Sequence, residues 1–156
     1  MYKLIILLIM MLMGCSDPGS SGLDVNPGEG VFTIKNIEYQ AEATFGTRVF
    51  GEDEVEQITL RASDTVFIDI LCEDFQKGVT TWDGEFWSEE DVHVFMIHRD
   101  LGGGFGPRSG YFIITKRTES YITGIFNMEL QDFASSCYNC PDDLVWVEGE
   151  FNVELN

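Results

Sequence analysis

Closely spaced cysteines are the residues of this chain whose type and spacing most directly permit chemistry. Cys137 and Cys140 form a C-x-x-C motif. A redox-active pair needs a lowered thiol pKa, usually from a helix N-terminus or nearby cations, whereas Asp142 and Asp143 place negative charge beside this motif. A zinc site normally takes four ligands, and the expected folded region adds only Cys72 and two distant histidines. We therefore expect a local disulfide, with free thiols or a pairing to Cys72 as the alternatives.

Histidines and carboxylates are the other groups that could act in catalysis. His93 and His98 are an odd number of residues apart on one expected strand, so their side chains face opposite ways and cannot form a same-strand metal pair. No pair stands out among the 27 acidic residues as the two carboxylates of a glycosidase. The serines lack the strained nucleophile turn that is typical of many serine hydrolases. The sequence therefore names no catalytic residue.

Glycine-rich and acidic loops give no cofactor or metal site either. The stretch Asp100–Gly110 lacks the Gly-Lys-Ser/Thr ending of a phosphate loop, and we interpret it as a mobile surface loop rather than a ligand lid. Calcium could bind at acidic runs, but none has the spacing of an ordered calcium loop. These runs are Asp53-Glu54, Glu89-Glu90-Asp91 and Asp142-Asp143.

Three aromatic residues, Trp82, Phe86 and Trp87, surround an Asp83-Gly84 dipeptide. Asp-Gly between short β-prone runs predicts a two-residue hairpin turn, because both turn positions favour positive φ. The aromatic side chains could stack on a sugar or an apolar ligand. The alternative, which we favour, is cross-strand packing that stabilises the hairpin.

The N-terminus has the organisation of an export signal. Lys3 precedes an apolar run, Leu4–Met13, which as a helix would span roughly 15 Å, half of a ~30 Å hydrocarbon core. Small Gly14 and then Cys15 follow. This pattern resembles the lipobox of bacterial lipoproteins, in which the signal is cleaved before the cysteine and the sulfur carries a diacylglyceryl group. The resemblance implies a signal peptide over residues 1–14, lipidation of Cys15 and a membrane contact through the lipid.

The segment after Cys15 is a tether by composition. Ser16–Gly30 is rich in Gly, Pro, Ser and Asp, so it cannot bury enough apolar surface to fold, and we expect residues 15–30 to be a flexible, disordered linker. By resemblance to lipoprotein sorting, Ser16 directly after the cysteine favours the outer membrane. The net charge of −18 repels nucleic acid and anionic lipid head groups, so nucleic-acid binding is not expected.

From Val31 onward the apolar residues alternate with a period of two, and no segment of helix length has a 3.6-residue period. We expect an all-β domain over residues 31–156, an antiparallel β-sandwich or barrel of about eight or nine strands. Glu52–Glu56 is expected to be an exposed acidic turn. Gly124 and Gly149 interrupt apolar faces and suggest a bulge or bend. The clearest strands are Gln57–Ala62, Thr65–Cys72, Val92–His98, Tyr121–Leu130 and Leu144–Leu155.

The last two expected strands carry a recurring ending, Ile122-Thr123-Gly124-Ile125-Phe126 and then Gly149-Glu150-Phe151-Asn152-Val153. Together with the lipobox, this pattern resembles small Bacteroidota lipoproteins of unknown function that repeat an I-T-G-x-F…G-x-F-x-V ending. The resemblance covers nearly all of the expected domain. Its motifs are structural, and it implies no activity for any residue.

Three functional hypotheses follow from these features. The first is a lipid-anchored, non-enzymatic interaction or structural β-domain at the outer membrane, with an unknown protein or glycan partner. The second is a β-barrel that binds a small molecule or glycan. The third is a hydrolase, for which the sequence supplies no identifiable site.

The lipobox interpretation predicts that Cys15→Ala abolishes labelling by radioactive palmitate and releases the protein from membranes, because the acyl chains supply the anchoring energy. Metabolic labelling followed by membrane fractionation measures both effects. Unchanged labelling of the variant would contradict lipidation at Cys15.

Overall fold

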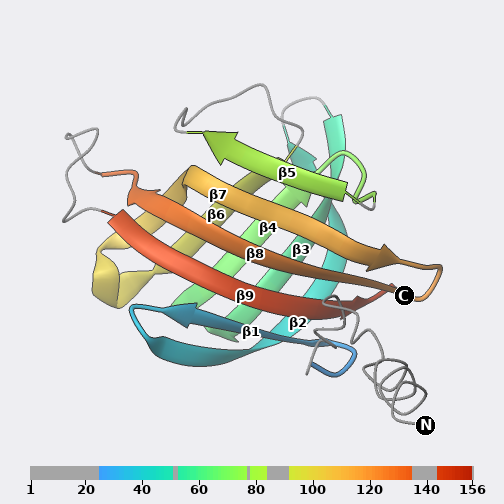
Figure 1. Cartoon of the computed structure of the whole chain (residues 1–156), viewed down its shortest axis with the longest axis horizontal. Helices are drawn as coiled ribbons and strands as arrows, with labels where there is room; N and C mark the ends of the chain where they lie inside the picture. Colours follow the sequence, from blue (N-terminus) through green and yellow to red (C-terminus); the bar gives the residue numbers. More distant parts are fainter. Residues whose placement is uncertain (1–24, 51–52, 77, 84–91, 135–143, 156) are drawn as a thin grey trace, which may run out of the picture.

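The computed structural model describes residues 25–50, 53–76, 78–83, 92–134 and 144–155, which form nine β-strands and one short 3₁₀ helix (Figure 1). The all-β prediction is therefore confirmed. The strands are β1 (Glu29–Ile34), β2 (Ile37–Phe50), β3 (Asp53–Ser63), β4 (Val66–Cys72), β5 (Gly78–Asp83), β6 (Val92–His98), β7 (Gly103–Arg117), β8 (Tyr121–Asp132) and β9 (Leu144–Glu154), and the helix η1 spans Arg99–Leu101.

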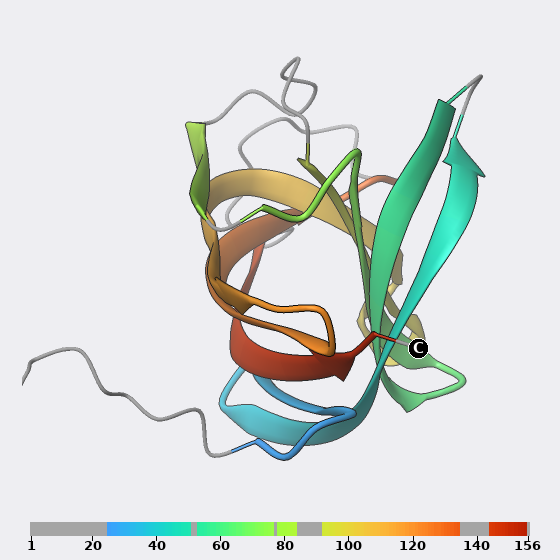
Figure 2. The same cartoon turned by 90° about the vertical axis from the view of Figure 1, so that its right-hand side faces the viewer.

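Eight of these strands close into an antiparallel barrel. The order around the ring is β1-β2-β3-β4-β6-β7-β8-β9, and β9 pairs with β1 to complete it. Figure 2 shows the ring almost end-on. Of the two architectures left open by the sequence, the structure is thus the barrel rather than the sandwich.

The barrel has a seam between β6 and β7. β7 pairs with β6 only through Gly103–Phe105, and further along its length the same edge pairs with β5 through Ser109–Ile114. β5 is therefore a ninth strand that adds to β7 where β6 has diverged from it. The seam has to be closed by side chains as well as by strand pairing.

The interior of the barrel is filled by large apolar side chains. Alternate residues of each strand point inward, as in Val66, Ile68 and Ile70 of β4, because successive side chains of a strand face opposite sides. Among the described residues, the core also contains six phenylalanines that are almost fully buried: Phe32, Phe75, Phe105, Phe112, Phe126 and Phe151.

The glycines of β8 and β9 make room for two of these rings. Gly124 pairs with Phe151 and Gly149 pairs with Phe126. Each phenylalanine ring occupies the space that a side chain at the opposite glycine position would need. The β8–β9 ladder continues through both positions without a register shift. The expected bulge is therefore not at these glycines in the β8–β9 pair; the shift next to Gly124 lies in the β7–β8 pair, between Ile114 and Lys116.

Two local expectations were wrong. Most of the glycine-rich stretch Asp100–Gly110 is not a mobile loop but the first half of β7, paired with both β6 and β8. One of its glycines allows a close side-chain contact, since Gly104 lies against the ring of Phe133. The acidic turn expected over Glu52–Glu56 is also wrong from Asp53 onward, because β3 begins at Asp53 and Glu56 is partly buried within it.

The N-terminal part of the domain contains a turn that the period-two alternation of apolar residues did not predict. Lys35 and Asn36 have φ of 49° and 65° and connect β1 to β2 as a two-residue hairpin loop. β1 begins at Glu29, and Gly30 packs against Leu60 and Phe151. Residues 16–24 of the expected tether lie outside the described residues, as does the expected turn residue Gly84.

Two glycines on separate strands, Gly110 of β7 and Gly46 of β2, give a matched test of this packing. Gly110 has φ of 122°, and a Cβ there would overlap the backbone of Asn127 and Met128, whereas a Cβ at Gly46 would meet nothing within 4 Å. We expect Gly110→Ala to lower the free energy of unfolding by about 3 kcal/mol, from backbone strain plus overpacking.

Gly46→Ala is the control, and it should be neutral or slightly stabilising because alanine restricts the unfolded chain. Urea unfolding followed by tryptophan fluorescence compares the two variants. Equal unfolding midpoints would show that β7 does not approach β8 as closely as described.

Candidate functional site

Of the site residues predicted from the sequence, the structure describes only Trp82, and of Trp82 only the backbone. The backbone of Trp82 lies in β5 opposite Gly110 of β7. Phe86 and Trp87 lie outside the described residues, as do Cys15, Cys137 and Cys140. The aromatic ligand contact, the lipidation and the disulfide therefore stay predictions. Cys72 is buried, and its thiol lies 3.3 Å from the carbonyl oxygen of Asp74.

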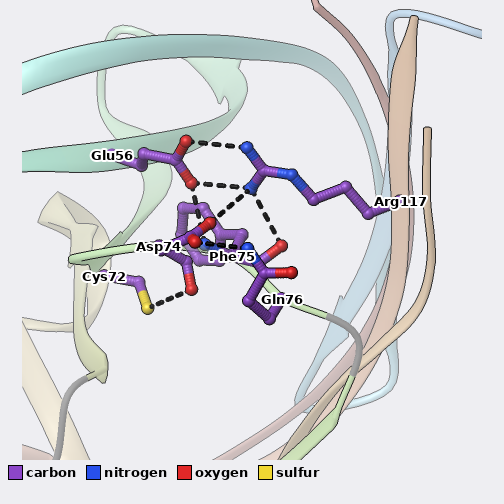
Figure 3. A network of polar contacts seen from close by, with 6 residues as sticks. All are labelled: Glu56, Cys72, Asp74, Phe75, Gln76 and Arg117. Carbon is purple, nitrogen blue, oxygen red and sulfur yellow. Dashed lines mark hydrogen bonds and ion pairs between the residues drawn. The ribbon is translucent and has the colours of Figure 1, made fainter. Parts of the chain in front are cut away.

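The most connected polar group of the described residues crosses the barrel seam (Figure 3). Arg117, at the end of β7, binds Glu56 of β3 with two parallel hydrogen bonds, Nη1 to Oε2 at 2.7 Å and Nη2 to Oε1 at 2.8 Å. The same Nη1 donates to the carbonyl oxygen of Phe75 at 2.9 Å and lies 3.3 Å from a carboxylate oxygen of Asp74. We call Glu56, Asp74, Phe75 and Arg117 the Arg117 cluster.

The Arg117 cluster holds Phe75 inside the barrel. The backbone N–H of Phe75 donates to Glu56 Oε2 at 2.7 Å, and its ring is only 1% exposed. That ring packs against Phe112 at 6.1 Å between centroids, and Phe112 in turn stacks on Phe151. The segment after β4 thus places an aromatic plug at the seam, and the ion pair keeps it in place.

In the Arg117 cluster, the Glu56 carboxylate and the Arg117 guanidinium each stabilise the charged form of the other. The hydrogen bond from Arg117 lowers the pKa of Glu56, with a further contribution from the Phe75 N–H, and burial partly opposes this shift. The hydrogen bond to Glu56 likewise raises the pKa of Arg117. Because both carboxylate oxygens of Glu56 accept hydrogen bonds, the cluster has the features of a structural latch rather than of a general acid or base.

A second polar pair joins buried His98 of β6 to partly buried Tyr39 of β2. His98 is 5% exposed, and its Nε2 is 3.0 Å from the Tyr39 hydroxyl, while its Nδ1 has no hydrogen-bond partner among the described residues. His93 lies on the opposite face of β6 and is partly exposed, as the odd spacing predicted. Where the chain is described, no three His, Cys, Asp or Glu side chains are placed to hold a metal ion.

The outer surface of the barrel carries a shallow hollow of about 310 Å³ over β1, β2, β7, β8 and β9. Its apolar and aromatic lining includes the outward-facing residues Val31, Ile125 and Tyr111. Three carboxylates from different parts of the sheet surround this lining: Glu38, Glu148 and Glu150. We call this feature the acidic hollow.

The pairing of the strands explains why these residues meet. Tyr111 lies opposite Asn127, Asn127 opposite Glu148, Glu148 opposite Thr33 and Thr33 opposite Glu38, so one outward-facing row crosses five strands. Sequence reasoning missed both this hollow and the Arg117 cluster. No short stretch of sequence indicates either feature, because strand pairing brings together residues that are far apart in the chain.

Comparison of the chain with protein-family models, curated proteins and solved structures gives no match. No helix among the described residues is long and apolar enough to cross a membrane.

The Arg117 cluster gives a pH-dependent prediction. We expect Glu56→Gln to lower the free energy of unfolding by about 2 kcal/mol near pH 7, because it removes the bidentate charge partner of Arg117 and leaves only the more exposed Asp74 carboxylate beside it. The folded-state pKa of Glu56 is lowered, so its stabilising effect is fully present above the ordinary carboxyl pKa and is lost as the pH falls through the folded-state value.

The difference between the wild type and Glu56→Gln should therefore shrink in acid. Glu54→Gln is the control, since Glu54 lies on the same strand and is exposed. Urea unfolding of the three proteins between pH 3 and 7 measures the effect. A wild-type advantage that did not change with pH would show that the Glu56 charge does not contribute.

Proposed function

We propose that this protein is a lipid-anchored, non-enzymatic interaction domain, held at the outer membrane through Cys15, and that it binds its partner through the outside of its barrel. The signal-like N-terminus and the cysteine after it support the anchor. The acidic hollow carries the binding part of the proposal.

The filling of the barrel supports an external site. An eight-stranded barrel has an interior just wide enough for side chains to fill or for one small ligand. Here six buried phenylalanines occupy that interior, and Phe75 is latched into the seam. A ligand in this part of the interior would have to displace packed side chains.

The position of the acidic hollow supports binding there. It lies on strands that are hydrogen-bonded to neighbours on both sides, so its side chains are held on a rigid part of the sheet. Apolar lining surrounded by polar groups is the usual composition of a recognition site. No arrangement of a nucleophile with an activating base accompanies it among the residues that the structure describes.

A glycan is the second candidate partner. Tyr111 is 37% exposed and lies opposite Asn127 across the β7–β8 ladder. A half-exposed aromatic ring beside amide and carboxylate groups offers an apolar face together with hydrogen-bond donors and acceptors. Those groups also suit the hydroxyls of a sugar.

The test is site-specific photocrosslinking in cells of the native organism. A benzophenone amino acid at Tyr111 should give a discrete protein adduct when the chain is anchored through Cys15. The same amino acid at Phe67, on β4, should not, because β4 lies across the barrel from the hollow (Figure 1). Identical adducts from both positions, or none from Tyr111, would contradict the proposal.

A further inference from the structure

The outer face of β1, β2 and β9 is dominated by glutamates. We call Glu29, Glu38, Glu42, Glu148, Glu150 and Glu154 the glutamate face; all six are exposed or partly exposed. Where the structure is described, the ion pairs join Arg61 to Asp64, Arg108 to Glu129, and Arg117 to Glu56 and Asp74. None of these cations belongs to the glutamate face, so its charge is not neutralised there.

The register of the strands increases this repulsion. Glu29 and Glu42 lie directly opposite each other in the β1–β2 ladder, and like charges placed this way destabilise a sheet. Neutral amides supply the hydrogen bonds that the structure gives: Asn26 donates to Glu29, Gln40 to Glu38 and Asn127 to Glu148. Hydrogen bonds of this kind hold the carboxylates in place but leave their net charge.

The acidic hollow overlaps the glutamate face at Glu38, Glu148 and Glu150 and adds an apolar contact. Glu148 and Glu150 are alternate residues of β9, so both point outward, and Val31 and Ile125 are the cross-strand neighbours of Glu150. At about 310 Å³, the hollow is at the lower end of the range of roughly 300–1,000 Å³ for ligand pockets. It is suited to one apolar side chain projecting from a larger partner.

The chemistry of this face selects among partners. Nucleic acid and anionic lipid are repelled by its charge. A metal ion lacks a cluster of ligands in the described parts of the chain. A protein segment with lysine or arginine would neutralise the unpaired carboxylates, and electrostatic complementarity of this kind steers association and fixes register.

We propose that the glutamate face docks a cationic protein segment, whose lysines or arginines pair with Glu38, Glu148 and Glu150 while one apolar side chain enters the acidic hollow. This inference rests on the proposed interaction function and specifies its partner.

The test uses the lipidated full chain in a neutral detergent and a fluorescein-labelled nine-residue peptide of alternating lysine and leucine. Fluorescence anisotropy gives the dissociation constant. We expect the double variant Glu148→Gln/Glu150→Gln to weaken binding about tenfold, and higher salt to reduce that difference, since exposed charge pairs are screened.

The matched control is Glu54→Gln/Glu73→Gln, which removes the same charge at two exposed positions away from this face. It should bind the peptide as the wild type does. Ile125→Thr tests the hollow: it should weaken binding of the lysine–leucine peptide but not of a lysine–glycine peptide. Urea unfolding shows whether each variant keeps the wild-type fold.

Equal weakening by the two double variants would overturn the proposal, because net charge alone would then explain binding. Undetectable peptide binding by the wild type would also overturn it, as would binding of a glycan that the peptide does not displace. If the Tyr111 adduct persisted in Glu148→Gln/Glu150→Gln, only the charge-based inference would fall and the interaction domain would stand.

Discussion

The ion pair between Arg117 and Glu56 closes the barrel where strand pairing does not. β7 leaves β6 after Phe105, and the sheet then has an opening that hydrogen-bond ladders alone cannot fill. A bidentate arginine–carboxylate pair is suited to this position, because its planar geometry fixes two strands and its charges satisfy each other in a partly buried setting. The same two side chains hold Phe75 at the opening. Closure of the barrel at this point and packing of its core therefore both depend on the Arg117–Glu56 pair.

The division between the inside and the outside of the barrel follows from that closure. Once the ring is closed, alternate residues of every strand are committed to a small interior, which phenylalanine rings and β-branched side chains fill. The glycines opposite Phe126 and Phe151 serve this packing, because any side chain at Gly124 or Gly149 would take the space of a ring. The outward positions carry no such constraint, and recognition is therefore most readily placed there.

The fold gathers part of the chain's negative charge on one face of the barrel. A strongly acidic composition alone is compatible with simple solubility. In the barrel, however, six glutamates gather over β1, β2 and β9, and two of them face each other across a ladder. Repulsion that folding itself does not relieve is a cost that a cationic partner would remove. The hollow that overlaps the same face would give such a partner a place for an apolar side chain.

The sequence by itself determined the all-β class, the inward faces of the regular strands and the position of Cys15 behind a signal-like segment. Period-two alternation and the residues of an export signal are local patterns, and a local pattern can be read without knowing the partners. Only the tertiary structure decided the barrel, the pairing of Arg117 with Glu56 and the row from Tyr111 to Glu38. It also turned the glycine-rich stretch from Gly103 onward into a strand, where the close approach of the β8 backbone requires glycine at Gly110. Each of these depends on which strands pair and in what register, and that choice is made by packing over long separations in the chain.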